Sequence, residues 1–405
     1  MREGWSSVAI GCVVRQVRRS VPVRAGVEYP LLGMRWYGEG PFLRETVTAD
    51  SAKARVYFQV RAGDFLYNRL FAWKGSFGVV PERLAGSYVS GEFPVFQTVP
   101  ELALNEYINL VMCRPVVWEQ ILRESTGSTA TSRNRWNESR FVEWEIPLPP
   151  LAEQRRIVDL IAAVDAAGEA ARRQVVAARL AYRRAAGDAL NRVGGSTLAL
   201  GAAVDLRMGR QRAPRFAAGP NMHPYLRAAN VKDGRLQLDD VLSMDFNPSE
   251  QATFALLPGD VLVSEGCGSL AQLGASAVWN GELPGVVCFQ NTLLRLRARP
   301  GLTDPGYVHH LARHAHAAGA WASIASGTNI FHIGSNRAEL LPVPVPPVSE
   351  QVSIARMLDA LDNTVTATDA EAGTLAGLRS AVVSDLLAGD HAIPDSYDRF
   401  IDSAA

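Results

Sequence analysis

The sequence Pro-Leu-Pro-Pro-Leu-Ala-Glu-Gln occupies residues 147–154, and Pro-Val-Pro-Pro-Val-Ser-Glu-Gln occupies residues 344–351. The two peptides are 197 residues apart, which is nearly half of the 405-residue chain. This period is too long for the repeat unit of a solenoid. A duplication of one whole domain together with its connector accounts for it, so we predict two similar modules in one chain.

Shorter pairs of similar segments occur in the same order in both halves, at offsets of 190 to 200 residues. They are 5–11 with 196–201, 29–32 with 223–226, 62–66 with 258–262, 105–108 with 305–308, and 126–127 with 326–327. The sequence between these segments is dissimilar. This pattern favours a shared scaffold whose recognition surface differs between the two copies.

Each copy combines signals for strands and helices. Short apolar runs such as 56–60 and 261–263 are bounded by Gly, Pro or Asp, which is typical of strands and turns. Helical apolar spacing appears in 104–123 and 306–323. Proline at alternate positions of 341–347 removes backbone donors from one edge, which predicts an edge strand or an extended arm. We therefore predict mixed α/β (α+β) modules with a modest sheet.

A long helix is predicted after each module, in 151–194 and in 348–390. Apolar and small residues step by four and three in both segments and keep the same register after the 197-residue offset, which indicates the seam of a coiled coil. The main seam residues are Ile157, Ile161, Val164, Val175, Ile354, Leu358, Leu361, Leu375, Val382 and Leu386. The alternative is that each helix covers only its own module.

Composition is that of an ordinary globular protein, with 47% hydrophobic and 20% charged residues and zero net charge. The sequence has no apolar run long enough for a membrane span and no secretion signal, and its four scattered cysteines predict reduced core thiols in a cytoplasmic protein. The charge is uneven: residues 1–347 carry +7 and residues 348–405 carry −7. Arginine outnumbers lysine 38 to 3. That bias suits phosphate and guanine recognition, although GC-rich codon usage explains it equally simply.

On these residues the chain resembles the specificity subunit of type I restriction–modification systems. The segment Pro-Leu-Pro-Pro-Leu-Ala-Glu-Gln-Arg-Arg-Ile-Val at 147–158 is similar to the helix entry of that family. Gly-Asp-Val-Leu-Val-Ser at 259–264 and Gly-Thr-Asn-Ile-Phe-His-Ile at 327–333 are typical of its recognition domains. In the first half, 127–133 departs from this last pattern. The resemblance covers residues 5–390.

The resemblance implies an organisation and a function. It implies target-recognition domains at 1–150 and 195–347, helical spacers at 151–194 and 348–390, and an acidic tail at 391–405. The spacers would form an antiparallel coiled coil in a pseudo-twofold arrangement. Two helices of 35–40 residues would be about 50–60 Å long at ~1.5 Å per residue. Each domain would recognise one half of a bipartite double-stranded DNA target, and the helices would dock DNA adenine methyltransferase subunits, with restriction subunits as further partners.

The same resemblance implies a subunit without catalysis, in which S-adenosylmethionine and ATP bind the partner subunits and no cofactor or metal binds this chain. The sequence agrees, because it has no phosphate-binding G-x-x-x-x-G-K-[ST] motif and no Pro-Pro-aromatic methyltransferase tetrapeptide. Gly38-Glu39-Gly40 predicts a turn. The histidine cluster at 309–316 lacks a nearby acidic ligand, so we interpret it as a solvated or phosphate-facing helix rather than a metal site.

DNA binding requires cations for phosphates and polar side chains for base edges. Basic runs at matched positions, the segments before each Pro-Pro and the residues after each Gly-Asp strand satisfy this requirement. The candidates are Arg15, Arg18, Arg19, Arg24, Lys74, Arg133, Arg135, Arg140, Arg207, Arg210, Arg212, Arg215, Ser264, Ser269, Asn329, His332, Asn336 and Arg337. Solvated loops and turn chemistry are the alternatives at these positions.

Two other functions fit the same sequence. A protein-binding coiled-coil scaffold without DNA binding is favoured slightly by the modest net charge. The same DNA-recognition module could also serve another phage-defence or modification system. The sequence does not specify the DNA target.

Overall fold

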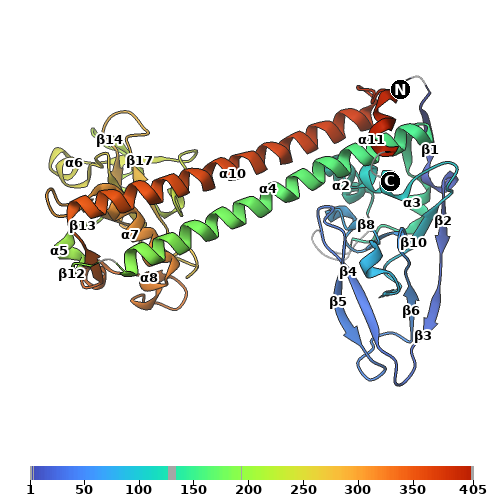
Figure 1. Ribbon diagram of the computed structural model, residues 1–405, viewed down its shortest axis with the longest axis horizontal. Coiled ribbons are helices and arrows are strands. Elements are labelled where there is room, and N and C mark those ends of the chain that lie inside the picture. The colour runs from blue at the N-terminus through green and yellow to red at the C-terminus, as the bar shows by residue number, and fades with distance from the viewer. Residues whose placement is uncertain (1, 3, 126–133, 193, 403–405) are drawn as a thin grey trace. The chain divides into compact units, whose positions relative to one another are not determined.

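The computed structural model describes residues 2, 4–125, 134–192 and 194–402. The chain divides into two compact units, Met1–Ala170 with Gly373–Ala405, and Ala171–Ala372. We call residues 1–150 module 1 and residues 195–347 module 2. The long helices α4 (Leu151–Arg192) and α10 (Val348–Ala388) each contribute one half to either unit (Figure 1).

Module 1 combines short strands with three helices and three 3-10 turns among its described residues. Its strands are β1 (Ser6–Ala9), β2 (Val14–Val17), β3 (Ser20–Pro22), β4 (Tyr29–Met34), β5 (Pro41–Val47), β6 (Val56–Gln59), β7 (Phe65–Tyr67), β8 (Phe77–Val79), β9 (Tyr88–Val89), β10 (Val95–Thr98) and β11 (Glu145–Leu148). Its helical elements are η1 (Ile10–Cys12), η2 (Ala72–Lys74), η3 (Glu82–Leu84), α1 (Asn105–Met112), α2 (Pro115–Glu124) and α3 (Glu138–Glu143).

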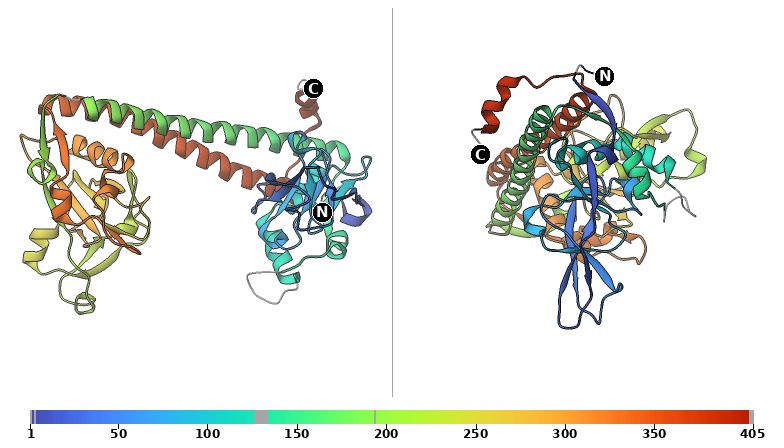
Figure 2. Two further views of the ribbon diagram at one scale, coloured as in Figure 1. Left: turned by 90° about the horizontal axis from the view of Figure 1, so that it is seen from below. Right: turned by 90° about the vertical axis from the view of Figure 1, so that its right-hand side faces the viewer.

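Two sheets organise module 1. The four-stranded sheet has the order β2-β10-β7-β8, and the five-stranded sheet has the order β3-β6-β9-β4-β5. The strands β3 to β6 form an elongated lobe in the right-hand view of Figure 2. The sheet content is therefore larger than the modest sheet that the sequence predicts.

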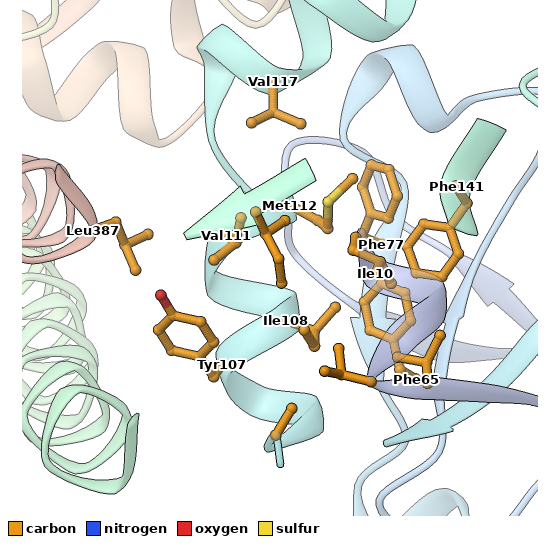
Figure 3. Packing of buried hydrophobic residues seen from close by; sticks show 14 of the residues in the cluster. Ile10, Phe65, Phe77, Tyr107, Ile108, Val111, Met112, Val117, Phe141 and Leu387 are labelled. Atoms are coloured by element: carbon orange, nitrogen blue, oxygen red, sulfur yellow. The ribbon is translucent and has the colours of Figure 1, made fainter. Parts of the chain in front are cut away.

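The core of module 1 lies between the four-stranded sheet and the helices. Figure 3 shows Tyr107, Ile108 and Val111 of α1 next to Ile10 and the aromatic rings of the sheet. On the other side of α1, Leu387 of α10 belongs to the same core. The single helix expected in 104–123 is in fact α1 and α2, because Pro115 disfavours a helical conformation in the residue before it and begins the second helix instead.

Module 2 repeats this construction with different loops. Its strands are β12 (Ser196–Ala199), β13 (Val204–Met208), β14 (Met222–Leu226), β15 (Val231–Lys232), β16 (Arg235–Leu236), β17 (Leu242–Asp245), β18 (Asp260–Ser264), β19 (Gly266–Cys267), β20 (Ser276–Trp279), β21 (Cys288–Phe289), β22 (Leu293–Ala298), β23 (Phe331–His332) and β24 (Pro342–Val345). Its helical elements are α5 (Leu200–Ala203), η4 (Pro214–Phe216), η5 (Ala228–Asn230), α6 (Pro248–Phe254), α7 (Pro305–Ala317), α8 (Ala320–Ser323) and α9 (Ser335–Glu339).

The central sheet of module 2 has the order β13-β22-β18-β20, which matches the order β2-β10-β7-β8 of module 1. Smaller sheets β17-β14-β21 and β15-β16 complete the module. The helix expected in 306–323 ends at Ala317, and Gly319, with φ of 75°, separates it from α8. Module 2 therefore shares the central scaffold of module 1.

The sequence interpretation of α7 as a solvated or phosphate-facing helix is wrong. His309 and His310 are buried against the module, and Tyr307, Val308 and Leu311 of the same helix lie in its core. A histidine on a helix is neutral over most of the physiological range and packs as an aromatic ring when neighbours cover it. The sequence pattern alone does not show that cover.

The proline-rich peptides form edge strands, as predicted. Among the described residues, β11 pairs with β1 alone and β24 pairs with β12 alone, both antiparallel. In β24, Val343 and Val345 are buried and the intervening proline takes the outer position. The tyrosines of α1 and α7 anchor these strands, because Tyr107 Oη donates to Pro147 O at 2.8 Å and Tyr307 Oη donates to Pro344 O at 2.9 Å.

The glutamine that ends the first duplicated peptide is fully buried and fastens α4 to module 1. The Gln154 amide oxygen accepts from Leu104 N at 3.0 Å. Its amide nitrogen donates to the carbonyl oxygens of Leu102 and Pro149, both at 2.9 Å. The side chain thereby joins the segment before α1, at Leu102 and Leu104, to the proline-rich peptide about 45 residues later.

The glutamine of the second peptide makes the same three bonds in module 2. Gln351 accepts from Asp304 N at 2.9 Å and donates to Leu302 O at 2.9 Å and to Pro346 O at 2.7 Å. It is also fully buried. The duplicated peptide is therefore a structural joint between each module and its helix.

The expected seam is the least exposed face of both long helices. The ten main seam residues, from Ile157 to Val175 on α4 and from Ile354 to Leu386 on α10, are all buried or half-buried. Figure 1 shows the two helices side by side. Within the first unit the Arg379 side chain pairs with Asp165, and within the second unit Arg179 pairs with Asp369 at 2.8 Å.

The C-terminal acidic segment folds back onto α4 within the first unit. After α10 the chain forms η6 (Asp395–Tyr397) and α11 (Asp398–Asp402). Arg156 of α4 binds Asp398 through two bonds of 2.6 and 2.7 Å and also binds Asp395. Tyr397 Oη donates to Asp159 at 2.8 Å. The described part of this segment therefore covers the beginning of α4.

All four cysteines are unpaired. Cys288 is buried and Cys113 and Cys267 are half-buried, but Cys12 is exposed, so the expectation of core thiols is wrong for Cys12. No helix among the described residues is long and apolar enough to cross a membrane.

Candidate nucleic-acid interface

The candidate segments of module 2 converge at one end of its central sheet. β13 ends at Met208, which pairs with Leu294, and β18 ends at Ser264, which pairs with Leu293 at the start of β22. Because both strands run antiparallel to β22, the loops 209–221 and 265–275 leave the sheet at the same end. Segments that are about 55 residues apart in the sequence thus form one surface.

A third segment joins this surface through the short ribbon of β19 and β23. Gly266 pairs with His332 and Cys267 pairs with Phe331. Ser326 and His332 exchange backbone hydrogen bonds of 3.0 and 2.8 Å, which closes a tight loop over 327–331. Gly327 occupies this turn with φ of 116°, where a Cβ atom would lie 2.0 Å from Ile330 O. Only glycine satisfies this geometry.

A buried carboxylate holds the ribbon in place. The Glu265 side chain accepts from Gly334 N at 3.1 Å and lies 3.1 Å from His332 Nδ1. Arg337 donates to Ser326 Oγ at 2.8 Å and to His332 O at 2.9 Å. These contacts leave residues 268–270 and 327–330, at the tips of the two loops, exposed.

Most of the predicted residues of module 2 are accessible at this end. The exposed candidates are Arg207, Arg212, Arg215, Ser269, Asn329, His332, Asn336 and Arg337. Arg337 and His332 also have the intramolecular partners described above, so their role in the loop is at least partly structural.

Arg210 and Ser264 are corrections to the predicted set. The Arg210 side chain is only 8% exposed, pairs with Glu250 at 2.7 Å and lies 3.4 Å from the centre of the Phe216 ring. Its guanidinium therefore supports the loop after β13. Ser264 is buried at the end of the central strand β18. Sequence spacing identified the segments correctly as loop-adjacent, but inward and outward directions depend on tertiary contacts.

Module 1 gathers its candidates at the matching sheet end. β2 ends at Val17, which pairs with Val95 at the start of β10, and Leu66 near the end of β7 pairs with the same residue. The loops after β2 and β7 therefore leave the sheet together, as in module 2. Arg18, exposed directly after β2, lines a groove at this end together with Arg69.

The predicted residues of module 1 differ in their availability. Arg15, Arg18 and Arg24 are exposed. Arg135 pairs with Glu92 at 2.7 Å, and Arg140 lies 3.9 Å from Glu143. Arg133 lies outside the described residues.

Arg19 is also a correction. It donates to the fully buried carboxylate of Asp64, with one bond of 3.1 Å, and its side chain is 17% exposed. Gln97 donates to the same carboxylate at 2.9 Å. Removing Arg19 would leave a buried charge poorly compensated, so this arginine has a structural role.

Sequence reasoning missed two residues next to Lys74. The Lys74 ammonium lies 3.7 Å from the centre of the Trp36 ring, and Trp36 and Tyr37 are 40% and 65% exposed. The signal was present as an adjacent aromatic pair before Gly38-Glu39-Gly40, which forms the predicted turn between β4 and β5.

The described residues contain no group of three His, Cys, Asp or Glu side chains that could hold a metal ion. Burial lowers the pKa of His309 to about 3, with further lowering from His310 and Arg313. Burial also lowers the pKa of His310, although its bond to Asp359 opposes this effect. The histidine cluster is thus part of the packing of module 2.

Comparisons with known proteins agree with the repeated architecture. Residues 33–178 match the model of the type I restriction modification DNA specificity domain. The chain is 27% identical over 138 residues to the type I restriction enzyme StySPI specificity subunit of Salmonella potsdam. This match covers 34% of the chain and 29% of that relative, so it spans less than a third of the relative's length.

Solved structures match over nearly the whole chain. A chain from a study of complex assembly and conformational transition of the type I R-M system has a TM-score of 0.61 at 20% identity, with 96% of this chain and 98% of that chain covered. The type I restriction–modification S subunit from M. genitalium has a TM-score of 0.56 at 13% identity, with 95% and 96% covered. These likenesses concern the fold.

Fold and interface together define a class of proteins in which two duplicated mixed α/β modules are joined to a pair of long helices. Within this class, residues 33–178 match the type I restriction–modification DNA specificity domain, and the chain has the fold of a type I specificity subunit. The resemblance inferred from the sequence is thereby confirmed.

Proposed function

We propose that this chain is the DNA-recognition subunit of a type I restriction–modification complex and that each module recognises one half of a bipartite DNA target. The observation that carries the proposal is the matched pair of sheet ends. In each module the strand order is the same and exposed arginines lie in the loops at the same end of the sheet. Cations supply affinity for phosphates, and the differing loop residues supply base specificity.

The proposal assigns no catalysis to this chain. The specificity domain is the matched family, and the candidate interface consists mainly of arginines with amides, hydroxyls, Lys74 and His332, whose ring contacts Glu265. Methylation of adenine with S-adenosylmethionine, and cleavage driven by ATP, would belong to partner subunits.

The long helices supply a surface for those methyltransferase subunits. Their seam faces are covered, but Val176 and Leu180 on α4 and Met357 and Leu378 on α10 are exposed. Exposed apolar side chains among charged ones are typical of a protein interface.

A module exchange tests the proposal. The chain is co-expressed with a candidate methyltransferase subunit from the same genome, and methylated sites are mapped by sequencing. Replacing residues 1–145 by the first module of another specificity subunit is expected to change one half of the methylated target only. If both halves change, or neither, the modular reading of DNA is wrong. If no methylation appears and the complex shows no DNA binding at low salt, the protein-scaffold alternative is favoured.

A charge reversal tests the interface itself. Because Arg210 is structural, the variant is Arg212→Glu with Arg215→Glu, and the control is Arg299→Glu, which lies after β22 at the opposite end of the same sheet. The double variant removes two expected phosphate contacts. It should therefore weaken DNA binding by about tenfold or more and reduce the slope of log K against log salt concentration by about 2. Equal affinities for the double variant and the control would remove this sheet end from the interface.

A further inference from the structure

The turn between β4 and β5 of module 1 has a strained backbone. Tyr37 has a φ of 58°, and among the described residues it is the one non-glycine residue with a positive φ. Tyr37 N donates to Lys74 O at 2.7 Å, and Gly38 N donates to Gly75 O at 2.8 Å. Strain of this kind is concentrated at functional sites. Two neighbouring backbone bonds hold Tyr37 in this conformation.

The strained turn presents aromatic rings beside cations. Trp36 contacts Phe71 with ring centres 5.6 Å apart, and Tyr37 contacts Trp118 at 6.1 Å. The Lys74 ammonium lies over Trp36. These contacts hold the two rings in place, and Trp36 and Tyr37 remain 40% and 65% exposed. We call Trp36, Tyr37 and Lys74 the Trp36–Tyr37 surface.

Exposure of this extent is unusual in the chain. Among the described residues, the exposed Phe, Trp and Tyr side chains are Trp36, Tyr37 and Phe400, and none of these lies in module 2. Exposed aromatic rings next to a cation are the arrangement with which proteins stack on single-stranded or unpaired nucleotide bases. Arg35, which precedes Trp36 in the chain, is also exposed and lies over the Phe42 ring at 4.9 Å.

The position of this surface indicates the ligand. Lys74 belongs to the loop that joins β7 to β8, which corresponds to the loop that joins β18 to β20 in module 2. The backbone bonds that close these loops match, because Asn68 N donates to Ser76 O at 3.0 Å and Ser264 N donates to Ala275 O at 2.8 Å. The Trp36–Tyr37 surface therefore lies with the loops at the sheet end to which we assign DNA contact.

We propose that Trp36 and Tyr37 stack on bases displaced from the DNA duplex that module 1 binds, with Lys74 beside the phosphates. This inference rests on the proposed function and adds a contact that module 2 does not have among its described residues. The two modules would then hold DNA differently: module 1 through stacking and charge, and module 2 through charge and polar loop tips.

The test uses Tyr37→Gly, alone and with Trp36→Ala, in the full chain assembled with its methyltransferase subunit. Glycine adopts a positive φ without strain, so relief of strain offsets the lost ring contact and the thermal midpoint stays close to that of the parent. Binding of a duplex that contains the mapped methylation site is expected to weaken on the order of tenfold for each ring removed. Phe400→Ala, which removes an exposed ring from α11, is the control and should bind like the parent.

The outcomes are separable from those of the proposed function, because the parent complex reports on DNA recognition and the variants report on stacking. Unchanged affinity of Trp36→Ala/Tyr37→Gly, in a parent that binds DNA, overturns the inference. Loss of the methyltransferase subunit from the purified variant complex also overturns it, because the surface would then be a protein contact. Tyr37→Phe retains the ring and should bind DNA like the parent.

Discussion

The two modules share a backbone hydrogen bond after the central strand, but the residues that accept it have side chains of opposite charge. In module 1 Trp136 N donates to Arg69 O at 3.0 Å, and in module 2 Ile333 N donates to Glu265 O at 3.0 Å. Each bond ties the loop after the central strand to the segment before the helix entry. Arg69 and Glu265 occupy corresponding positions, 196 residues apart, close to the 197-residue repeat.

The side chains at these positions bind different partners. Arg69 donates to both carboxylate oxygens of Glu138 at 3.1 Å and lies 3.6 Å from Glu92. Glu265 accepts from the loop that contains His332. The backbone geometry is therefore common to both modules, whereas charge at the sheet end is specific to each. Duplicated scaffolds of this kind can change their recognition surface without changing their fold.

The largest expected effect on the free energy of unfolding concerns the buried glutamine that both modules share. Gln351→Ala leaves two buried carbonyl oxygens and Asp304 N without partners, so we expect a loss of about 3–5 kcal/mol in the free energy of unfolding. Gln154→Ala should cost a similar amount in module 1. Denaturant unfolding measures both, and Ser349→Ala, at an exposed neighbouring position, is the control. A cost as small as that of the control would show that the joint is not needed.

A charge reversal should break one module and leave the other intact. Arg69→Glu places three carboxylates together with Glu92 and Glu138, and we expect a loss of about 2–3 kcal/mol in module 1. Adding Glu138→Arg should restore part of this stability. Hydrogen exchange of amides in each module provides the measurement. If the double variant is no more stable than Arg69→Glu, the ion pair between Arg69 and Glu138 does not stabilise module 1.

Acidification should lower the stability of module 2 more than that of module 1, because all seven histidines lie at residue 223 or later. Burial holds the pKa of His309 at about 3 in the folded chain, below its ordinary value of 6.5. Below pH 6.5 the unfolded chain therefore binds more protons, and folding weakens as pH falls, by up to about 1.4 kcal/mol per pH unit for one group.

Unfolding followed between pH 7 and 5 measures this effect. Module 2 should lose stability over this range through His309, and module 1 should lack the histidine contribution. His309→Phe, which keeps a buried ring without a titrating group, should reduce the slope for module 2. An unchanged slope in that variant would contradict the assignment to His309.

The smallest expected effects concern the ion pairs between α4 and α10. Arg379 with Asp165 and Arg179 with Asp369 are all at least 40% exposed, so solvent screens both pairs. Double-mutant cycles with Asp165→Asn and Asp369→Asn should give coupling energies below about 1 kcal/mol in either unit. A coupling well above this value in one unit would show that the two halves of the helix pair are not equivalent.

Local sequence patterns predicted a large part of the fold. The repeat, the edge strands with alternating proline and the seam beginning at Ile157 and Ile354 all follow from spacing along the chain. The helix breaks at Pro115 and Gly319 were visible in the sequence, but the prediction followed the apolar periodicity across them and missed both. The family was also predicted, because its motifs lie at the joints, where backbone geometry demands particular residues.

The sequence identified charged loop segments, but it did not show which of their residues are exposed. Arg19 and Arg210 belong to basic runs, yet each pairs with a carboxylate that is distant in the sequence, Asp64 and Glu250. Trp36 lies outside those runs and is brought beside Lys74 by the turn. Spacing shows which loops carry charge, but a side chain is free only if no neighbour from another segment neutralises or covers it.

The sequence by itself therefore determined the duplication, the element types and the helix register, because periodicity and proline act on residues close along the chain. The tertiary structure decided which arginines are exposed, that α7 is buried and that the two sheet ends correspond. Antiparallel pairing with the central strand brings loops from distant segments to one end of each sheet, and only there do burial and charge pairing select the residues that remain available.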